Sequence, residues 1–211
     1  MNHTLSGIIC AALALLTLSS CSNSTQQTPE GITSPAIRTI MARRSIRSYK
    51  SNPVSRDTLD VILNCGINSA NAMNRQSWEI RVVDNASLID SVTRAFLRVN
   101  PKMANTPGFV NMFRNAPAVI FIANETASGM SQIDCGLLGG GNIMIAATSL
   151  GLGTCCLGGP IAFLKSDEGK FFLDKLAFSE GYELLYAIAI GYPAESPEAK
   201  PRKSSKISYV L

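Results

Sequence analysis

Pro117-Ala-Val-Ile-Phe-Ile-Ala123 is an uninterrupted apolar run, and it is the stretch of this sequence that decides the fold. A short apolar run bounded by turn-forming residues is typical of a central β-strand that is covered on both faces. Leu184-Leu-Tyr-Ala-Ile-Ala-Ile190 repeats the pattern, and Trp78-Glu-Ile-Arg-Val-Val83 alternates like a half-buried strand. One helical pattern begins near Ser55, before the first of these runs, and another begins near Asn85, between two of them, so we expect an α/β or α+β domain in three layers.

The segment from Cys135 to Leu164 contains no charged residue. A membrane span needs about 20 apolar residues, so a span is one interpretation of this segment. Its eight glycines, together with Asn142 and Thr148, lower the hydropathy and favour close backbone packing. We predict a buried helix that ends at Gly151 and is followed by a loop facing a ligand. A helix that is apolar on all sides needs cover from the sheet and from another subunit.

The N-terminal region is typical of a bacterial lipoprotein signal. Residues 5–20 form an uncharged apolar run, and Leu18-Ser-Ser-Cys21 fits a lipobox, whose cysteine is lipid-modified after cleavage. The run is shorter than an ordinary spanning helix of about 20 residues. No Lys or Arg precedes it, and a plain secretory signal or an uncleaved anchor are the alternatives.

We therefore expect a signal peptide over residues 1–20, a lipidated Cys21 with a flexible tether over 21–34, and one domain over 35–211. This organisation predicts a lipid-anchored protein of the bacterial cell envelope, on the periplasmic or surface face. A cytoplasmic location follows if the leader is not a signal.

The charge balance argues against a nucleic-acid partner. The chain has 19 Lys and Arg against 15 Asp and Glu, a formal net charge of +4. Nucleic-acid binders more often carry a pI above about 9 with basic residues massed on one face. Here the acidic and basic residues are interleaved, so we expect no nucleic acid.

Histidine and cysteine usage excludes several kinds of catalytic site. The only histidine, His3, falls within the expected signal peptide, which argues against Ser-His-Asp and Cys-His catalysis and against most zinc sites. Beyond the lipobox the cysteines are Cys65, Cys135, Cys155 and Cys156. Two disulfides are one interpretation, but the adjacent pair and the spacings favour buried free thiols and no metal site. An enzyme without histidine often takes its reactivity from a cofactor.

Four motifs have residue types suited to an anionic, planar ligand. Arg43-Arg44-Ser45-Ile46-Arg47 and Lys200-Pro-Arg202 supply cations that match phosphate oxygens. Ser69-Ala-Asn-Ala-Met-Asn-Arg-Gln-Ser-Trp78 carries carboxamides that both donate and accept hydrogen bonds. Gly151-Leu-Gly-Thr-Cys-Cys-Leu-Gly-Gly159 matches neither the dinucleotide fingerprint nor a triphosphate loop. The alternatives are solvated basic segments, helix-ending asparagines beside a core tryptophan, and a glycine loop that caps a helix.

In this order along the chain, the motifs resemble those of the FMN-dependent nitroreductase family, over residues 37–209. The resemblance implies an α+β, three-layer fold with a central mixed β-sheet flanked by helices. It also implies a homodimer that binds FMN at the dimer interface with contributions from both chains. The FMN-binding residues that it implies are Arg43, Arg44, Ser45, Arg47, Asn71, Asn74, Gln76, Leu157, Gly158, Gly159, Lys200 and Arg202.

The resemblance also implies the chemistry. Hydride or electrons pass through flavin N5 from a small-molecule donor to a nitroaromatic, a quinone or a related acceptor, with the Gly158 amide near N5 and no catalytic side chain. NAD(P)H is the family's usual donor, but it is not normally available outside the cytoplasm, so a membrane quinol or a redox protein is the alternative donor. The segment from Asn100 to Phe113 is expected to shape the acceptor pocket, with Phe109 and Phe113 as walls or as core residues. A flavin-binding or ligand-binding surface lipoprotein without turnover is the competing interpretation.

Overall fold

The computed structural model describes residues 34–210 in two units, which are treated separately below. The larger unit extends to Ala199, and the smaller one contains residues 200–210. The expected signal peptide, Cys21 and most of the tether lie outside the described residues.

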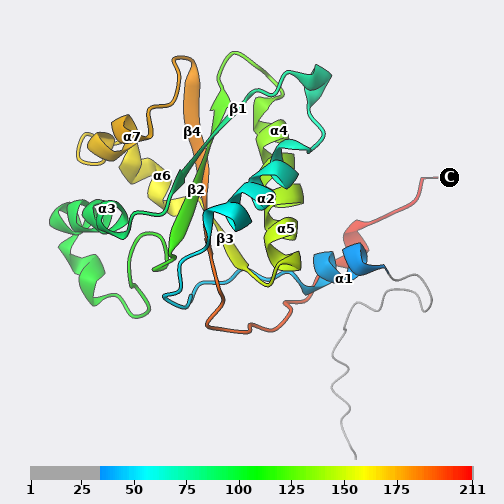
Figure 1. The fold of residues 1–211 in the computed structure, drawn as a ribbon, viewed down its shortest axis with the longest axis horizontal. Coiled ribbons are helices and arrows are strands. Elements are labelled where there is room, and N and C mark those ends of the chain that lie inside the picture. The colour runs from blue at the N-terminus through cyan, green and yellow to red at the C-terminus, as the bar shows by residue number, and fades with distance from the viewer. Residues whose placement is uncertain (1–33, 211) are drawn as a thin grey trace, which may run out of the picture. The chain divides into compact units, whose positions relative to one another are not determined.

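A four-stranded sheet forms the centre of the larger unit, with the strand order β1-β2-β4-β3 (Figure 1). The two continuous apolar runs are its central strands, as predicted, because each is covered on both faces. All three strand pairs are antiparallel, and parallel pairing is limited to an isolated bridge between Ser45 and Thr154. The sheet is therefore antiparallel and not mixed as expected, apart from this single parallel bridge. The strands are β1 Trp78–Val83, β2 Ala118–Glu125, β3 Gly153–Leu157 and β4 Tyr182–Gly191.

One face of the sheet packs against a helical layer that the chain builds from two segments. The inward side chains of β2 and β4 form one core cluster with apolar side chains of this layer, among them Leu59, Ile62, Leu138 and Ile143. The elements are α2 Arg56–Ile67, α4 Ser131–Gly136, a π-helical turn Leu137–Ile143 and α5 Met144–Ser149.

The opposite face carries the second core cluster, rich in phenylalanine. Phe113, Phe121 and Phe172 meet there with ring centroids 5.4 to 6.4 Å apart. The covering helices lie on the other side of the sheet from α2, α4 and α5, so the three-layer prediction is confirmed (Figure 1). They are α3 Ala86–Val99, α6 Gly159–Leu164 and α7 Lys170–Leu176.

Short elements complete the chain. Helix α1, Pro35–Ala42, begins at Ser34, whose hydroxyl accepts a hydrogen bond from the Ile37 N–H at 3.2 Å. The 3-10 turns are Ala72–Asn74 and Pro101–Asn105 in the larger unit and Ser204–Lys206 in the smaller one.

The uncharged segment from Cys135 to Leu164 is helical only in its first part. The helix ends in a turn at Gly151, which has a φ of 75°, as predicted. The loop predicted beyond it was wrong, because Gly153–Leu157 forms the edge strand β3. Within residues 34–210, no helix is long and apolar enough to cross a membrane.

The π-helical turn requires a glycine at position 139. A Cβ atom there would lie 2.0 Å from the hydroxyl oxygen of Tyr186, which donates a hydrogen bond to the Cys135 carbonyl. The tyrosine ring therefore packs directly on the helix backbone. This close approach joins β4 to the helical layer.

Candidate functional site

The first basic segment is anchored to the sheet by its apolar member. The Ile46 N–H donates to the Thr154 carbonyl at 2.9 Å, and the Ile46 side chain is buried against Gly153. A Cβ at Gly153 would lie 2.6 Å from Ile46 Cγ1, so this approach requires glycine. Arg43 and Arg44 are half-buried, whereas Arg47 is exposed.

The guanidinium groups of this segment contact carbonyl oxygens and no carboxylate among the described residues. Arg44 Nη1 donates to the Met41 carbonyl at 2.6 Å and to the Arg43 carbonyl at 2.9 Å. Arg47 Nη1 donates to the Ser45 carbonyl at 3.2 Å. None of the four ion pairs in the described chain involves these arginines. Their charges are therefore available to an anion.

Glu195 and Tyr49 hold the basic segment in place. The Glu195 carboxylate accepts hydrogen bonds from the backbone N–H groups of Arg47 and, at 3.2 Å, of Ser48. The Tyr49 hydroxyl donates to the Ile46 carbonyl at 2.7 Å. Burial raises the pKa of Tyr49 far above its ordinary value, so the phenol stays neutral and keeps this bond.

The end of β3 presents two exposed glycines that this chain's own packing does not require. A Cβ at Gly158 or Gly159 would meet nothing within 4 Å, and Gly158 has a φ of −92°, which any residue adopts. Leu157, by contrast, is buried in the core. The space in front of both glycines is therefore open to a ligand. An edge at which the backbone is unobstructed suits a planar group that needs close approach.

Asn71, Asn74 and Gln76 lie on a loop just before β1. Asn71 Oδ1 accepts a hydrogen bond from the Gln76 N–H at 3.0 Å, while the Asn74 and Gln76 side chains are exposed. Trp78, at the start of β1, is buried in the core, as the structural alternative predicted.

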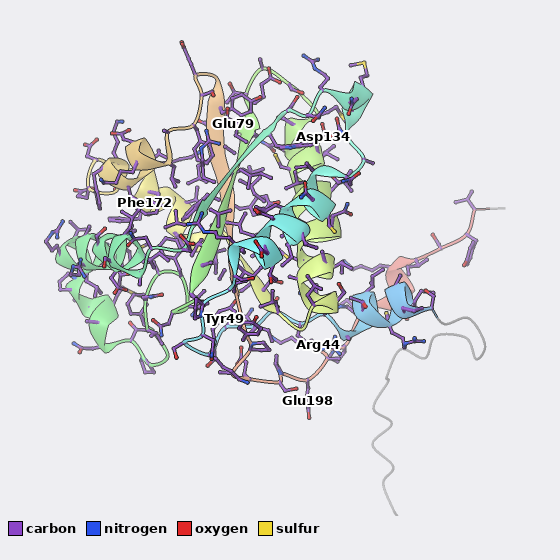
Figure 2. The ribbon with its side chains drawn as sticks, in the orientation of Figure 1. Arg44, Tyr49, Glu79, Asp134, Phe172 and Glu198 are labelled. Carbon is purple, nitrogen blue, oxygen red and sulfur yellow. The ribbon has the colours of Figure 1, made fainter. Side chains whose placement is uncertain are left out.

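The chain does not bring this loop to the open glycines. Trp78 pairs with Asn124, which pairs with Glu183 of β4, whereas Leu157 pairs with Ala187 of the same strand. Glu183 and Ala187 are four residues apart along β4, which covers about 13 Å, and three strand spacings across the sheet add about 14 Å at right angles. Trp78, at the end of the loop, and Leu157, before the open glycines, are therefore roughly 20 Å apart. Figure 2 shows Asp134, which accepts a hydrogen bond from the Ala72 N–H of this loop, near one end of the larger unit and Arg44 of the first basic segment near the other end.

Lys200 and Arg202 belong to the smaller unit. Both are exposed, and Arg202 Nη1 donates to the Lys200 carbonyl at 3.3 Å. Their approach to the first basic segment stays a prediction.

A cavity of about 380 Å³ adjoins Gly159. Phe109 lines it, 6.1 Å from Phe96 between ring centroids, and its role as a wall of the acceptor pocket stays a prediction. Phe113 is fully buried in the core instead. The sequence interpretation missed Arg114, which also lines the cavity and has a φ of 60°. The one feature of the sequence that could have indicated Arg114 is that it is the only charged residue between Lys102 and Glu125.

A second hollow of about 470 Å³ lies between α7 and β4. Its lysines are engaged, Lys165 with Glu183 at 3.3 Å and Lys170 with Asp174. Paired charges leave less for a ligand, so the cavity beside Gly159 is the better candidate.

All four cysteines of the described chain are free thiols, as expected. Cys135 and Cys155 are buried, but Cys65 and Cys156 are exposed, so the expected burial was wrong for these two. Cys156 keeps exposed surface, yet the protein around its sulfur removes part of the water, and this desolvation, followed by the neighbouring Cys155, raises the pKa of the thiol. The thiol beside the open glycines therefore stays protonated at neutral pH.

Known proteins share the fold described above. A nitroreductase with bound FMN from Desulfitobacterium hafniense superposes with a TM-score of 0.75 at 27% identity, covering 85% of this chain and 100% of that one. A nitroreductase with bound FMN from Bacteroides fragilis gives 0.72 at 26% identity, with the same coverage. The NADPH-flavin oxidoreductase of Vibrio harveyi is 24% identical over 181 residues, which span 79% of this chain and 69% of the relative. The sequence model of the nitroreductase family matches residues 40–192, from the first basic segment to the end of β4, and the chain belongs to that family.

Proposed function

We propose that this protein is an FMN-dependent oxidoreductase that passes electrons from a small-molecule donor to a nitroaromatic, a quinone or a related acceptor. One observation carries the proposal: the basic segment pairs with β3 at Thr154, and the open glycine amides follow at the end of the same strand, about 13 Å farther along it. The guanidinium groups of that segment form no ion pair in the described chain. Two similar structures of the same family hold FMN.

The residues of the larger unit fit the two ends of such a cofactor. Arg43, Arg44 and Arg47 offer charge-assisted hydrogen bonds to a phosphate, and Ser45 adds a hydroxyl. Gly158 and Gly159 leave their backbone unobstructed, so a flat ring system can lie against it. FMN, when bound there, supplies hydride or electron transfer through its N5 atom.

The protein's own part is to bind, to orient and to stabilise charge. Backbone N–H groups at Gly158 and Gly159, beyond the paired end of β3, are suited to donate toward developing negative charge without any cost of reorganisation. Residues 4–211 contain no histidine, so imidazole supplies no proton transfer there. The Phe109 cavity beside Gly159 is the place where an acceptor would lie.

We also propose that a second copy of the chain completes the site. The loop with Asn71, Asn74 and Gln76 is roughly 20 Å from Leu157 in one chain, farther than a three-ring flavin reaches. The outer face of the helical layer supports a dimer, because Ile133 and Leu137 are 55% and 44% exposed there. An unpartnered apolar helix face of this kind is typical of an oligomer interface.

We propose that Cys21 anchors the protein to a membrane by lipidation, as the lipobox predicts. The electron donor is then a membrane quinol or a redox protein in place of NAD(P)H. Rapid reduction of the bound flavin by NADH, together with a cytoplasmic location in cell fractionation, would contradict both proposals.

The first experiment is an absorption spectrum of the purified full chain, before and after heat release of any chromophore and after addition of FMN. Near-stoichiometric flavin that is reduced by a donor and reoxidised by a quinone supports the enzyme. Tight flavin without donor-dependent reduction points to a binding protein without turnover. A colourless protein that does not take up FMN overturns the proposal.

A further inference from the structure

The loop from Asn71 to Gln76 has a backbone conformation that its residues do not favour. Met73, Asn74 and Gln76 have φ angles of 52°, 54° and 53°. This left-handed region strains most residues other than glycine, asparagine being the best tolerated. Met73 is 84% exposed, so packing of its side chain within the chain does not hold it there. Such a conformation persists only where the surroundings impose it.

A contact from helix α4 holds the first turn of this loop. The carboxylate Oδ1 of Asp134 accepts a hydrogen bond from the backbone N–H of Ala72 at 3.1 Å. Ala72 opens the 3-10 turn, so the bond ties the turn to the helical layer. The bond between Asn71 Oδ1 and the Gln76 N–H closes the loop on itself but does not tie it to the rest of the domain.

Asp134 is an unusual residue at this position. It is 2% exposed, takes part in no ion pair among the described residues, and its Oδ2 finds no hydrogen-bond partner there. A buried charge without a counter-ion is costly. Its place in the first turn of α4 offsets part of that cost through the helix dipole. A charged acceptor, in return, binds an N–H more strongly than a neutral one does.

We propose that Asp134 is a positioning residue, which holds the Asn71–Gln76 loop in the strained conformation that presents its carboxamides to a flavin. The effect on FMN rests on the proposed function, whereas the effect on the loop does not. Two separate readouts therefore test the two statements.

The loop itself is tested by trypsin cleavage after the exposed Arg75 in the native full chain, followed by mass spectrometry. Loss of a hydrogen bond to a charged group makes the loop open more often, so Asp134→Ala should be cleaved about tenfold faster than the wild type. Asp134→Asn keeps an acceptor oxygen and should stay within about threefold. Unchanged cleavage of Asp134→Ala would overturn the proposal.

Ser131→Ala is the matched control. Ser131 is similarly buried in the same helical turn. Its hydroxyl shares its one proton between the Glu125 and Ser128 carbonyls, accepts a hydrogen bond from Asn124 Nδ2, and has no hydrogen bond to the loop. This variant should lose stability but be cleaved after Arg75 at the wild-type rate. Faster cleavage of Ser131→Ala, equal to that of Asp134→Ala, would assign the effect to α4 as a whole and overturn the specific role.

Ala72→Pro removes the same hydrogen bond from the donor side and leaves the buried helix intact, so it also serves if Asp134→Ala does not fold. Proline suits the first position of a helical turn. Asp134→Ala and Ala72→Pro each break the hydrogen bond between the Ala72 N–H and Asp134 Oδ1. The chain that carries both substitutions should therefore be cleaved no faster than the faster of the two single variants. Additive effects in this cycle, or wild-type cleavage of Ala72→Pro, would contradict the proposal.

FMN titration by flavin fluorescence separates the two claims. Asp134→Ala should raise the Kd for FMN about tenfold, and Asp134→Asn less than threefold. A wild-type chain that binds no FMN would overturn the proposed function, yet fast cleavage of Asp134→Ala would still support the hold on the loop. FMN binding that is equal in wild type and Asp134→Ala would overturn the presentation of the carboxamides.

Discussion

Replacing Gly158 by alanine separates binding from stability. The backbone at Gly158 has φ −92° and ψ −31°, which alanine adopts freely, and its Cβ would meet nothing within 4 Å. Alanine also restricts the unfolded chain, so the free energy of unfolding should rise by about 0.4–1 kcal/mol or stay unchanged. A residue retained for packing would give the opposite sign.

The same methyl group would occupy the space proposed for the flavin ring. By displacing the ring, the methyl group would break the hydrogen bond that the Gly158 N–H is proposed to donate to it. Loss of one hydrogen bond to a charged or developing-charge group corresponds to about 1.5–3 kcal/mol, so the Kd for FMN should rise roughly tenfold or more. Urea unfolding of the apo-protein measures the stability, and flavin fluorescence measures the Kd.

Gly153→Ala is the matched control, one strand length away. Its Cβ would lie 2.6 Å from Ile46 Cγ1, and such overpacking costs about 1–3 kcal/mol of unfolding free energy. The pair should thus show opposite changes in stability. Wild-type FMN affinity in Gly158→Ala would refute the assignment of the open glycine edge to the cofactor.

Three further predictions concern the rest of the larger unit. Gly139→Ala should lower the free energy of unfolding by about 2–4 kcal/mol in urea, because the methyl group would overlap the Tyr186 hydroxyl and break its bond to Cys135. Burial acts to raise the pKa of Glu79, but hydrogen bonds from Ser179 and the charge of Arg81 lower it overall. Its stabilisation is therefore present above the unfolded-state pKa and lost as pH falls through the folded-state value, so Glu79→Gln should remove about 0.5–1 kcal/mol at neutral pH and flatten the acid limb of unfolding curves. The midpoint of the pH profile of Cys156 alkylation by iodoacetamide should lie above pH 9.0, the ordinary pKa of a thiol; a midpoint at or below that pH would contradict the raised pKa.

Continuous apolar strands were the features that the sequence predicted best. The runs that became β2 and β4 have one stable solution, because a short segment without polar side chains must be covered on both faces. The segment that became β3 was misassigned as a loop. Its glycines weaken the strand pattern, and the reason for Gly153, contact with Ile46, lies in another part of the chain.

The candidate site shows the same limit at the level of single residues. The motifs identified Arg43, Arg47 and Gly158 by residue type, because guanidinium groups and unobstructed amides have few other uses in combination. Asp134 and Arg114 were not predicted as site residues, because a single charged residue in a helix or in an apolar segment belongs to no recognisable sequence motif. Their roles depend on contacts with Ala72 and with the cavity beside Gly159.

Local composition by itself predicted the strands β1, β2 and β4 and the helices that begin after Ser55 and Asn85, and it indicated which side chains are chemically able to bind an anion. Only the tertiary structure decided that the carboxamide loop and the open glycines lie roughly 20 Å apart, since sheet order and register set that separation. It also distinguished the glycines that internal packing requires, such as Gly139, from those that face open space, such as Gly158. The physical reason is that distance and free volume arise between segments far apart in the chain, where local sequence carries no information.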